Sequence, residues 1–480
     1  MNSHNLHKLI LLVLPLIFSG IMIPLWAQDN NIAGTELVIT GIEIEGNKIT
    51  KERIVTREIM FDVGDTITES NLNILVEKSR ENLMNTSLFN FVNHEIIKQE
   101  ETGASVMVRF ILTERWYIWP WPTIEFADRN FNTWWKENRD LSRMSYGVVL
   151  KWANFRGRKE LLELTARFGY IEQYGFDYTI PYLNKKGTLG MGIGASYGRT
   201  KEVPVINFND ELVYYKDDNE FVMEGVKAYL SLTYRKEIYN THTMKVEYNW
   251  SKFQDTLIKI NPDFSVDDKT QLQYFSLLYQ YKSDHRDYKP YPLDGYYFDV
   301  ELVKRGLGIL DNGDLDVFYV LTTFRKYFDL GRRFYFASGL NSKFSNNADQ
   351  PFYMSRAIGF GRDIVRGYEY YVVNGHNFGI FKNNLKFALL PTRTYDIDFI
   401  KSEKFGKVHY AFYLNAFFDF GYADNVTSDP NLNNTLENSL LFGYGLGLDF
   451  VTYYDLVFRF EYSFNHMGEH GFFLHFTAPI

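Results

Sequence analysis

The sequence of 480 residues contains no cysteine. This absence excludes disulfide bonds, thiolate metal sites, thiol nucleophiles and a lipid-modified N-terminal cysteine. The 51 basic and 59 acidic residues are mixed along the chain, and the formal net charge is −8. Because no basic block occurs, we expect no nucleic-acid partner. The sequence also lacks a Gly-rich phosphate loop and a nucleophile elbow, so we expect neither enzyme activity nor a cofactor.

Long hydrophobic runs are absent after residue 27. Before that point, a positively charged start is followed by an apolar stretch from Leu9 to Trp26 and by the small residue Ala27. This order predicts a signal peptide over residues 1–27, with an uncleaved anchor helix as the alternative. Pro15 and Pro24 weaken the anchor interpretation. Because no later run reaches 18 apolar residues, we expect no membrane-spanning helix in the mature chain.

Aromatic residues are abundant, at 18% of the chain, with 35 Tyr and 41 Phe. A soluble core does not need so many tyrosines, whereas membrane β-barrels place girdles of aromatic residues at both lipid–water interfaces. The mean hydropathy of −0.27 is compatible with a barrel. Half of each barrel strand faces a polar lumen, so barrel proteins are not hydrophobic on average.

Residues 35–115 are predicted to form one small α+β domain of order β-α-α-β-β. The predicted strands and helices are Leu37–Ile44, Lys51–Met60, Glu69–Asn85, Phe91–Lys98 and Ala104–Leu112. This segment resembles a POTRA (polypeptide-transport-associated) domain. The residues that carry the resemblance are Ile42, Gly46, Ile54, Gly64, Asp65, Leu83, Ser87, Leu88, Phe89 and Glu114. The resemblance implies a domain that captures client proteins, and only one copy is present.

Residues 120–480 are dominated by period-two alternation, which predicts β-strands. One example is Leu456, Phe458, Phe460 and Tyr462, which alternate with Val457, Arg459, Glu461 and Ser463. A soluble sheet with one wet face would give the same pattern. We predict sixteen strands, near 123–131, 146–155, 160–171, 175–183, 187–202, 220–236, 241–254, 271–283, 296–305, 315–328, 333–344, 377–390, 408–422, 441–452, 454–464 and 471–479.

The lengths of the connections favour a transmembrane barrel. Long connections at 132–145, 203–219, 255–270, 345–376 and 423–440 alternate mostly with short turns. Outer-membrane barrels have an even number of strands, long outer loops and short periplasmic turns. Two longer segments, 284–295 and 391–407, fall on the predicted periplasmic side as exceptions. The sequence therefore predicts a mainly β fold, a 16-stranded transmembrane β-barrel preceded by the small domain.

The connection between the eleventh and twelfth predicted strands contains Val365-Arg366-Gly367-Tyr368. This motif, in this loop, resembles the BamA/TamA superfamily, or bacterial surface antigen family. Its members fold, insert or secrete proteins across the outer membrane. The resemblance implies that the loop folds into the lumen and that its arginine pairs with an acidic residue of the thirteenth strand. An ordinary arginine in a surface loop is the alternative, because short motifs often match by chance.

The matching acidic residue is Asp419, which shares a strand face with Phe417. The next strand carries Gly447 and Asp449 on its inner face, which makes Asp449 a second candidate partner. An arginine in a confined lumen needs a carboxylate, because an unpaired buried charge is costly. Gly367 allows the backbone to bend sharply in the motif.

Two further segments resemble those of the family. One is Asp284-His285-Arg286-Asp287 with Pro290, Pro292 and Gly295, and the other is Asn154-Phe155-Arg156-Gly157-Arg158. The chain also departs from the family pattern. Asn383 and Asn384 stand where the family commonly has a glutamate, so we expect one lumen contact to be missing. The C-terminus lacks a terminal aromatic residue, and the single POTRA-like domain implies a narrower client range or different partners.

Two polar clusters are interpreted as turns, and we predict no metal site. The histidines His466, His470 and His475 are loosely spaced near the last predicted hairpin, without the companions that metal-binding histidines need. Asp311-Asn312-Gly313-Asp314 lacks the spaced ligands and the closing glutamate of a calcium loop.

The sequence therefore predicts a factor for outer-membrane protein assembly, insertion or translocation. We expect it in the outer membrane of a diderm bacterium, with the small domain in the periplasm. The expected partners are unfolded outer-membrane or secreted clients, outer-membrane lipids, and accessory periplasmic or lipoprotein partners. A passive channel and a purely structural barrel are the alternatives; an outer-membrane lipase or protease would need a catalytic constellation that we do not find.

Overall fold

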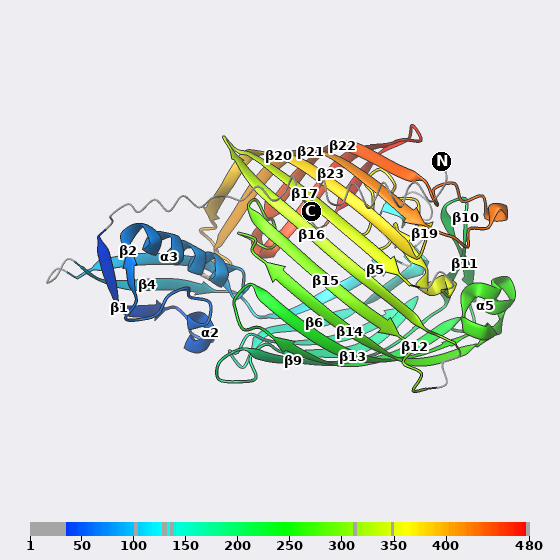
Figure 1. Cartoon of the computed structure of the whole chain (residues 1–480), viewed down its shortest axis with the longest axis horizontal. Helices are drawn as coiled ribbons and strands as arrows, with labels where there is room; N and C mark the ends of the chain where they lie inside the picture. The colour runs from blue at the N-terminus through cyan, green and yellow to red at the C-terminus, as the bar shows by residue number, and fades with distance from the viewer. Residues whose placement is uncertain are drawn as a thin grey trace.

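The computed structural model describes residues 35–99, 104–126, 132–134, 139, 141–310, 314–346, 350–402 and 404–476. The predicted signal peptide, most of the turn at 311–314 and the last four residues lie outside these ranges. A small α+β domain lies at one end of a large, curved antiparallel sheet (Figure 1). Among the described helices, none is both long and apolar enough to span a membrane.

The small domain consists of β1 (Glu36–Glu45), α2 (Glu52–Thr56), β2 (Thr66–Thr68), α3 (Glu69–Met84), β3 (Phe89–Lys98) and β4 (Ser105–Glu114). Its sheet has the order β2-β1-β4-β3, with β1 parallel to β4. Leu72 and Val76 of α3 pack on Val108 and Phe110 of β4 in the core. The predicted order lacked β2, because three residues are too few to show an alternating pattern.

Two turns of the small domain depend on glycine. Gly46 has a φ of +88°, and a Cβ atom at this position would lie 2.0 Å from the carbonyl oxygen of Leu112, so only glycine fits. Gly64 has a φ of +99°. Next to Gly64, the side chain of Asp65 accepts a hydrogen bond of 2.9 Å from the backbone N–H of Asp62. The POTRA-like residues Gly46, Gly64 and Asp65 therefore shape the turns before and after α2.

The large sheet has sixteen strands, as predicted. They are β5 (Ile118–Phe126), β6 (Met144–Phe155), β7 (Glu160–Gly169), β8 (Ile171–Ile180), β9 (Leu189–Thr200), β12 (Met223–Tyr234), β13 (Asn240–Phe253), β14 (Gln271–Asp284), β15 (Gly295–Arg305), β16 (Val317–Gly331), β17 (Phe334–Ser345), β20 (Asn377–Asp396), β21 (Lys407–Asp424), β22 (Leu440–Thr452), β23 (Leu456–Asn465) and β24 (His470–His475). Each strand pairs with the neighbour that precedes or follows it in this order. The predicted fold class is confirmed.

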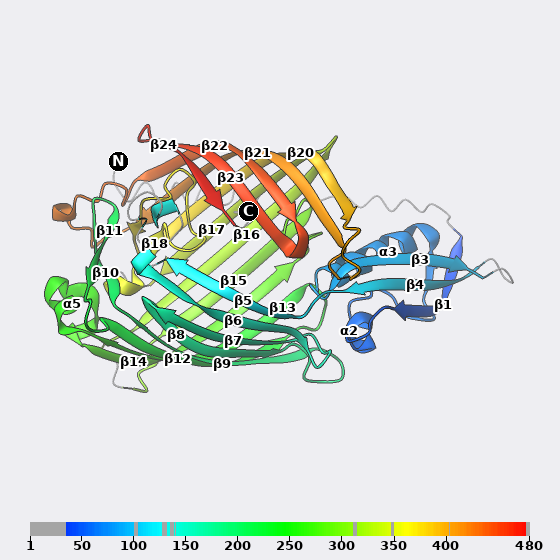
Figure 2. The ribbon, with the colours of Figure 1, turned by 180° about the vertical axis from the view of Figure 1, so that it is seen from behind.

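The first and last strands, β5 and β24, lie on the same side of the barrel (Figure 2). No backbone ladder joins them among the described residues, so the sheet is not closed. Instead, Asn132, in the connection that follows β5, contacts β24: its side chain donates to the carbonyl of Leu474 at 3.3 Å and accepts from its N–H at 3.2 Å. We call this junction between β5 and β24 the seam.

The strand β5 begins at Ile118, earlier than the predicted start near residue 123. Its ladder with β6 runs through Pro120 and Pro122. Proline is tolerated in an edge strand where its missing N–H would face away from the partner strand. The two prolines therefore leave the pairing with β6 intact and remove backbone donors from the edge that faces the seam.

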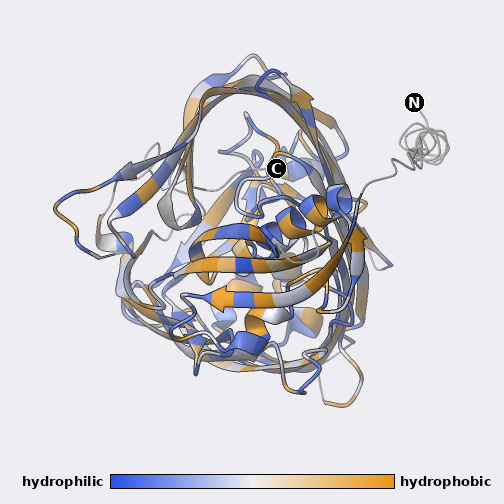
Figure 3. Ribbon diagram, turned by 90° about the vertical axis from the view of Figure 1, so that its left-hand side faces the viewer, coloured by the Kyte–Doolittle hydropathy of each residue, from blue (hydrophilic) through white to orange (hydrophobic). Residues whose placement is uncertain are grey.

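Packed loops cover the barrel end that lies away from the small domain (Figure 1). They contain the unpredicted hairpin β10 (Glu202–Phe208) and β11 (Glu211–Lys216), the helix α5 (Asp255–Ile260), and the short strands β18 (Arg356–Ile358) and β19 (Val373–Asn374). Val205, Leu257, Leu315 and Met354, from four different loops, share one apolar cluster. The small domain lies across the opposite end (Figure 3).

Candidate functional site

The loop between β17 and β20 places its predicted motif among the buried residues of the barrel. Arg366 is only 1% exposed. Its Nε donates to Oδ2 of Asp419 at 2.7 Å, and its Nη2 donates to Oδ1 at 2.5 Å. The guanidinium group also lies 3.9 Å from the ring centroid of Phe417. This bidentate geometry fixes both the position and the orientation of the loop.

The other side of the Arg366 guanidinium meets β20. Nη1 donates to Oδ1 of Asn384 at 2.7 Å, and Nη2 donates to the carbonyl of Asn383 at 3.4 Å. The expectation of a missing lumen contact on this strand was therefore wrong. A neutral amide accepts the hydrogen bond that a glutamate would otherwise accept, because the side-chain oxygen of asparagine is also an acceptor.

Asp449 does not pair with Arg366. It lies directly opposite Arg459 on β23, whose Nε and Nη2 each donate to it at 2.5 Å. Glu461 takes the place expected for Asp449, with its Oε1 3.4 Å from Nη1 of Arg366 and 3.5 Å from Nη1 of Arg459. Sequence reasoning missed Arg459 and Glu461 as site residues, although both lie on the polar face of an alternating strand.

Glycines on β22 let the loop lie directly against the barrel wall. A Cβ atom on Gly443 would lie 1.7 Å from the carbonyl oxygen of Arg366, whereas one on Gly447 would meet the wall itself, 2.9 Å from the side-chain amide of Asn415. In the motif itself, Gly367 has a φ of +94°, and its Cβ would lie 2.8 Å from the carbonyl oxygen of Phe464. Side chains at Gly443 and Gly367 would push the loop away from the wall.

Replacing Gly443 by alanine is expected to displace the motif loop and to lower the unfolding free energy of the barrel. Overpacking typically costs about 1–3 kcal/mol, and the obstacle here is backbone, which cannot rotate away. Unfolding in urea, followed by tryptophan fluorescence of the detergent-solubilised protein, measures the effect. Gly379→Ala on β20 is the matched control, because no atom lies within 4 Å of its added Cβ. Equal unfolding midpoints of the two variants would contradict the expectation.

Val365 and Tyr368 anchor the two ends of the motif. Val365 is fully buried in an apolar cluster with Ile358 and Leu441. The hydroxyl of Tyr368 hydrogen-bonds to Nδ1 of His466 and donates to the carbonyl of Phe442 at 3.3 Å. All four motif residues therefore contact the strands β21 to β23 or the turn between β23 and β24.

A polar chain connects this lumen site to the small domain. The hydroxyl of Tyr291 donates to Oδ2 of Asp449 at 2.6 Å. Tyr291 belongs to the segment 284–295, which resembles the family and lies on the small-domain side. The side chain of Asn85, at the end of α3, donates to the carbonyls of Arg286 and Asp287 at 3.1 and 3.0 Å. The small domain thus contacts the segment that enters the lumen.

The second family-like segment docks the other side of the small domain. Asn154 donates to the hydroxyl of Thr50 at 2.8 Å, and the carbonyl of Gly157 accepts from the N–H of Lys51 at 2.9 Å. Glu114 in turn accepts from the N–H and the hydroxyl of Thr50, at 2.7 and 2.6 Å. The turn between β6 and β7 therefore holds the loop that follows Gly46.

A deeply buried charge at this interface is Glu58, which is 1% exposed. Nη1 and Nη2 of Arg235, after β12, donate to its two carboxylate oxygens at 2.8 Å each, and the hydroxyl of Tyr182 donates at 2.9 Å. Nζ of Lys159 lies 3.9 Å away. Burial acts to raise the pKa of Glu58, but Lys159, Arg235 and the hydrogen bonds outweigh burial and lower it to about 2.

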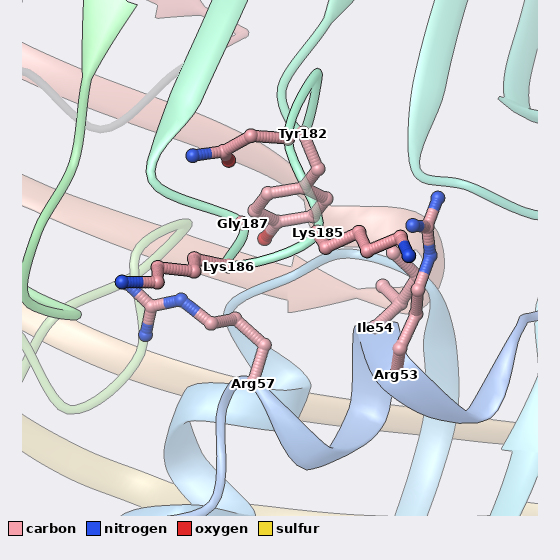
Figure 4. A pocket seen from close by; sticks show the side chains of 8 residues that line it. Arg53, Ile54, Arg57, Tyr182, Lys185, Lys186 and Gly187 are labelled. Atoms are coloured by element: carbon pink, nitrogen blue, oxygen red, sulfur yellow. The ribbon is translucent and has the colours of Figure 1, made fainter.

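A pocket beside Glu58 separates α2 from the turn between β8 and β9. Figure 4 shows basic side chains of both elements around it, and its cationic lining residues are Arg53, Arg57, Lys185 and Lys186. Arg57 also donates to the carbonyls of Arg235 and Lys236, at 3.2 and 3.0 Å. The helix α2 therefore meets the barrel through charged and hydrogen-bonded groups, beside an apolar cluster in which Ile54 and Val55 are joined by Tyr182.

Docking of the small domain is expected to weaken at acidic pH. The pKa of Glu58 is about 2 in the docked state, and we expect it to return to its ordinary 4.5 when undocking exposes the carboxylate to water. Its contribution, about 3 kcal/mol, is therefore fully present above pH 4.5 and is lost as the pH falls through 2. Burial lowers the pKa of Lys159 to about 7 from 10.5, so the titration of Lys159 changes docking only in the alkaline range.

Spin labels on cysteines introduced at Ile74 and Leu330 measure this docking, because both positions are exposed and the chain has no cysteine of its own. The label-to-label distance distribution is expected to stay constant from pH 7 to pH 5 and to broaden near pH 3. Glu58→Gln removes the titrating group and is the matched control. A wild-type distribution that is unchanged at pH 3, or the same response to pH in wild type and in Glu58→Gln, would contradict the assignment.

Comparison with known protein families shows the family to which the chain belongs. Residues 154–471 match the Omp85 superfamily domain, and residues 37–115 match a POTRA family, the surface antigen variable number repeat. The chain belongs to the Omp85 superfamily. This membership confirms the resemblance inferred from the motif loop, and it supports a general role in outer-membrane protein insertion or translocation.

Solved structures match most of the chain. CdiB from Escherichia coli, which has the same fold, is 12% identical, with a TM-score of 0.53, and the match covers 92% of this chain and 75% of that one. BamA from Haemophilus ducreyi lacking POTRA domains 1–3 is 16% identical, with a TM-score of 0.48 and coverage of 92% and 83%. No curated protein matches the chain by sequence.

Proposed function

We propose that this protein inserts client proteins into the outer membrane or translocates them across it, with the POTRA domain receiving clients in the periplasm. The observation that carries the proposal is the polar chain from Asn85 through Tyr291 and Asp449 to the Arg366 site. Its links are hydrogen bonds and ion pairs of 2.5–3.5 Å, except between Asp287 and Tyr291, which the backbone of the segment 284–295 connects. A passive pore has no need for a connection between a periplasmic domain and a lumen loop.

Client capture is assigned to the edge of the POTRA sheet. In the order β2-β1-β4-β3, the strand β3 is an edge strand of ten residues. An extended client segment can add to such an edge through main-chain hydrogen bonds, which give affinity with little sequence preference. The edge of β3 therefore suits unfolded client proteins of varied sequence.

The seam between β5 and β24 supports a lateral route for clients. The described polar link at this junction is the pair of hydrogen bonds between Leu474 of β24 and Asn132, which follows β5 in the chain. The edge of β5 lacks donors at Pro120 and Pro122, so pairing across the seam is weaker than within the sheet. The motif loop contacts β21, β22 and β23, the three strands that precede the seam strand β24 in the sheet. We assign to Arg366 and Asp419 the role of holding this wall in place.

A passive channel has less support than transport of proteins. The outer loops share an apolar cluster, and the tip of the β10–β11 hairpin is fixed to a second loop, where Asp210 accepts from the N–H groups of Thr435 and Leu436 at 2.9 and 3.1 Å. Loops held in this way cover the outer end. Outer-membrane lipids and accessory periplasmic or lipoprotein partners belong to the same proposal.

Quantitative proteomics after depletion of the protein tests the proposal. We expect outer-membrane, surface or secreted fractions to lose a defined set of clients, which wild-type protein restores and Arg366→Ala does not. Arg362→Ala is the matched control, because Arg362 is an exposed residue of the same loop. The identity of the lost proteins separates insertion of barrels from secretion of soluble clients. Fractions that are unchanged after depletion would exclude a transport role.

A further inference from the structure

Three side chains with metal-binding atoms converge in the lumen next to the seam. Glu369 follows the motif, Glu461 lies on β23, and His475 is the last residue of β24. One ligand atom from each lies within 4.8 Å of the others. Both glutamates are fully buried. Two carboxylates and one imidazole from three separate elements form a typical donor set for a divalent transition metal.

The spacing of these atoms fits an ion better than a hydrogen bond. Nε2 of His475 lies 3.3 Å from Oε2 of Glu461 and 3.5 Å from Oε1 of Glu369. A charge-assisted N–H···O bond would be about 2.7–2.9 Å long. Ligand atoms about 2.1 Å from a tetrahedral zinc ion lie roughly 3.4 Å apart. Among the described residues, neither Nε2 of His475 nor Oε2 of Glu461 makes a hydrogen bond of good geometry, so the long ion pair is the contact that these two atoms make with each other.

The surrounding groups orient the two carboxylates toward this point. Arg366 and Arg459 approach the other oxygen of Glu461, Oε1, and each already has a carboxylate of its own in Asp419 or Asp449. The N–H of Gly367 donates to Oε2 of Glu369 at 2.9 Å. Each glutamate therefore keeps one oxygen bound to fixed donors and directs the other toward His475. Such support is typical of carboxylates that ligate metals.

We propose that Glu369, Glu461 and His475 bind one divalent transition-metal ion, with Zn²⁺ as the best fit. An imidazole with two carboxylates leaves one tetrahedral position for water. The ion would connect the last strand, β24, to the lumen loop and to β23. The sequence alone predicted no metal here. Glu369 is far from His475 in the chain, and Glu461 lies on the neighbouring strand, so the spacing of the residues does not reveal the cluster. The binding itself does not depend on the transport role.

The test uses the full-length protein in detergent, stripped of metal by a chelator and titrated with Zn²⁺. Bound metal is measured by elemental mass spectrometry after desalting, and affinity by competition with a chromophoric chelator. We expect one Zn²⁺ per chain. His475→Gln and Glu369→Gln are expected to weaken binding at least about 100-fold, because even loss of a group that only supports a ligand costs roughly 10- to 100-fold.

Two controls keep the result specific. The first is His470→Gln. His470 lies on the same strand as His475 but contacts the hydroxyl of Tyr462, so this variant should bind Zn²⁺ like wild type. Glu369 is preferred to Glu461 for substitution, because Glu461 also faces both arginines and its loss threatens folding. The heat-dependent gel mobility of each variant verifies a folded barrel. Wild-type protein without stoichiometric Zn²⁺, or a folded His475→Gln variant with wild-type affinity, would overturn the proposal.

Discussion

Replacing Arg366 by alanine is expected to destabilise the barrel by about 3–5 kcal/mol, because removal of one partner leaves a buried charge without compensation. Asp419 and Glu461 are both fully buried, and Arg366 lies within 3.5 Å of each. We expect a lower urea midpoint and a loop that is more accessible to protease added from the outer side.

The matched control is Arg362→Ala in the same loop. Arg362 is exposed, and exposed substitutions usually change stability by less than about 0.5 kcal/mol. The double variant Arg366→Ala/Asp419→Ala is expected to be more stable than Arg366→Ala alone, since it also removes the unpaired carboxylate. An Arg366→Ala variant with the same midpoint as Arg362→Ala would show that the buried ion pair does not hold the loop.

Most of the barrel could be predicted because its environment imposes a strict pattern. A strand between lipid and a polar lumen must alternate, so segments such as Leu456–Asn465 are recognisable without tertiary information. Elements outside that environment were missed. The β10–β11 hairpin lies in a loop that the alternation did not resolve, and β5 begins within a run of Trp and Pro that local propensity disfavours as a strand.

The sequence predicted the residues of the site that belong to a recognisable motif, but not the contacts between residues that are far apart in the chain. The loop motif and Asp419 are identifiable from residue types and strand number, but the neighbours of each lumen side chain depend on strand register. Asp449 lies opposite Arg459 and is therefore paired with it. The pair of Glu58 and Arg235 depends on how the POTRA domain docks, because the two residues belong to different domains. No periodic pattern in one segment carries that information.

The ion pair between Glu58 and Arg235 leads to the second large expected effect, which is undocking of the POTRA domain in the variant Arg235→Ala. In the docked state Glu58 would remain buried with Tyr182 and Lys159 but without its bidentate partner, at a cost of about 3–5 kcal/mol. Undocking relieves that cost, because Glu58 then regains water. We therefore expect the POTRA domain of Arg235→Ala to leave the barrel at neutral pH, with a broad distance distribution between labels at positions 74 and 330.

Lys236→Ala is the matched control, since only the backbone carbonyl of Lys236 takes part in the interface. The double variant Arg235→Ala/Glu58→Gln should dock better than Arg235→Ala, because a neutral amide is cheaper to bury than a carboxylate. If Arg235→Ala stays docked, the remaining contacts, among them those of Asn85, Thr50 and Arg115, are sufficient to hold the domain. If it undocks, its client proteome becomes decisive: loss of the clients that depend on Arg366 would mean that the POTRA domain and the lumen loop act as one unit, as the polar chain between them implies.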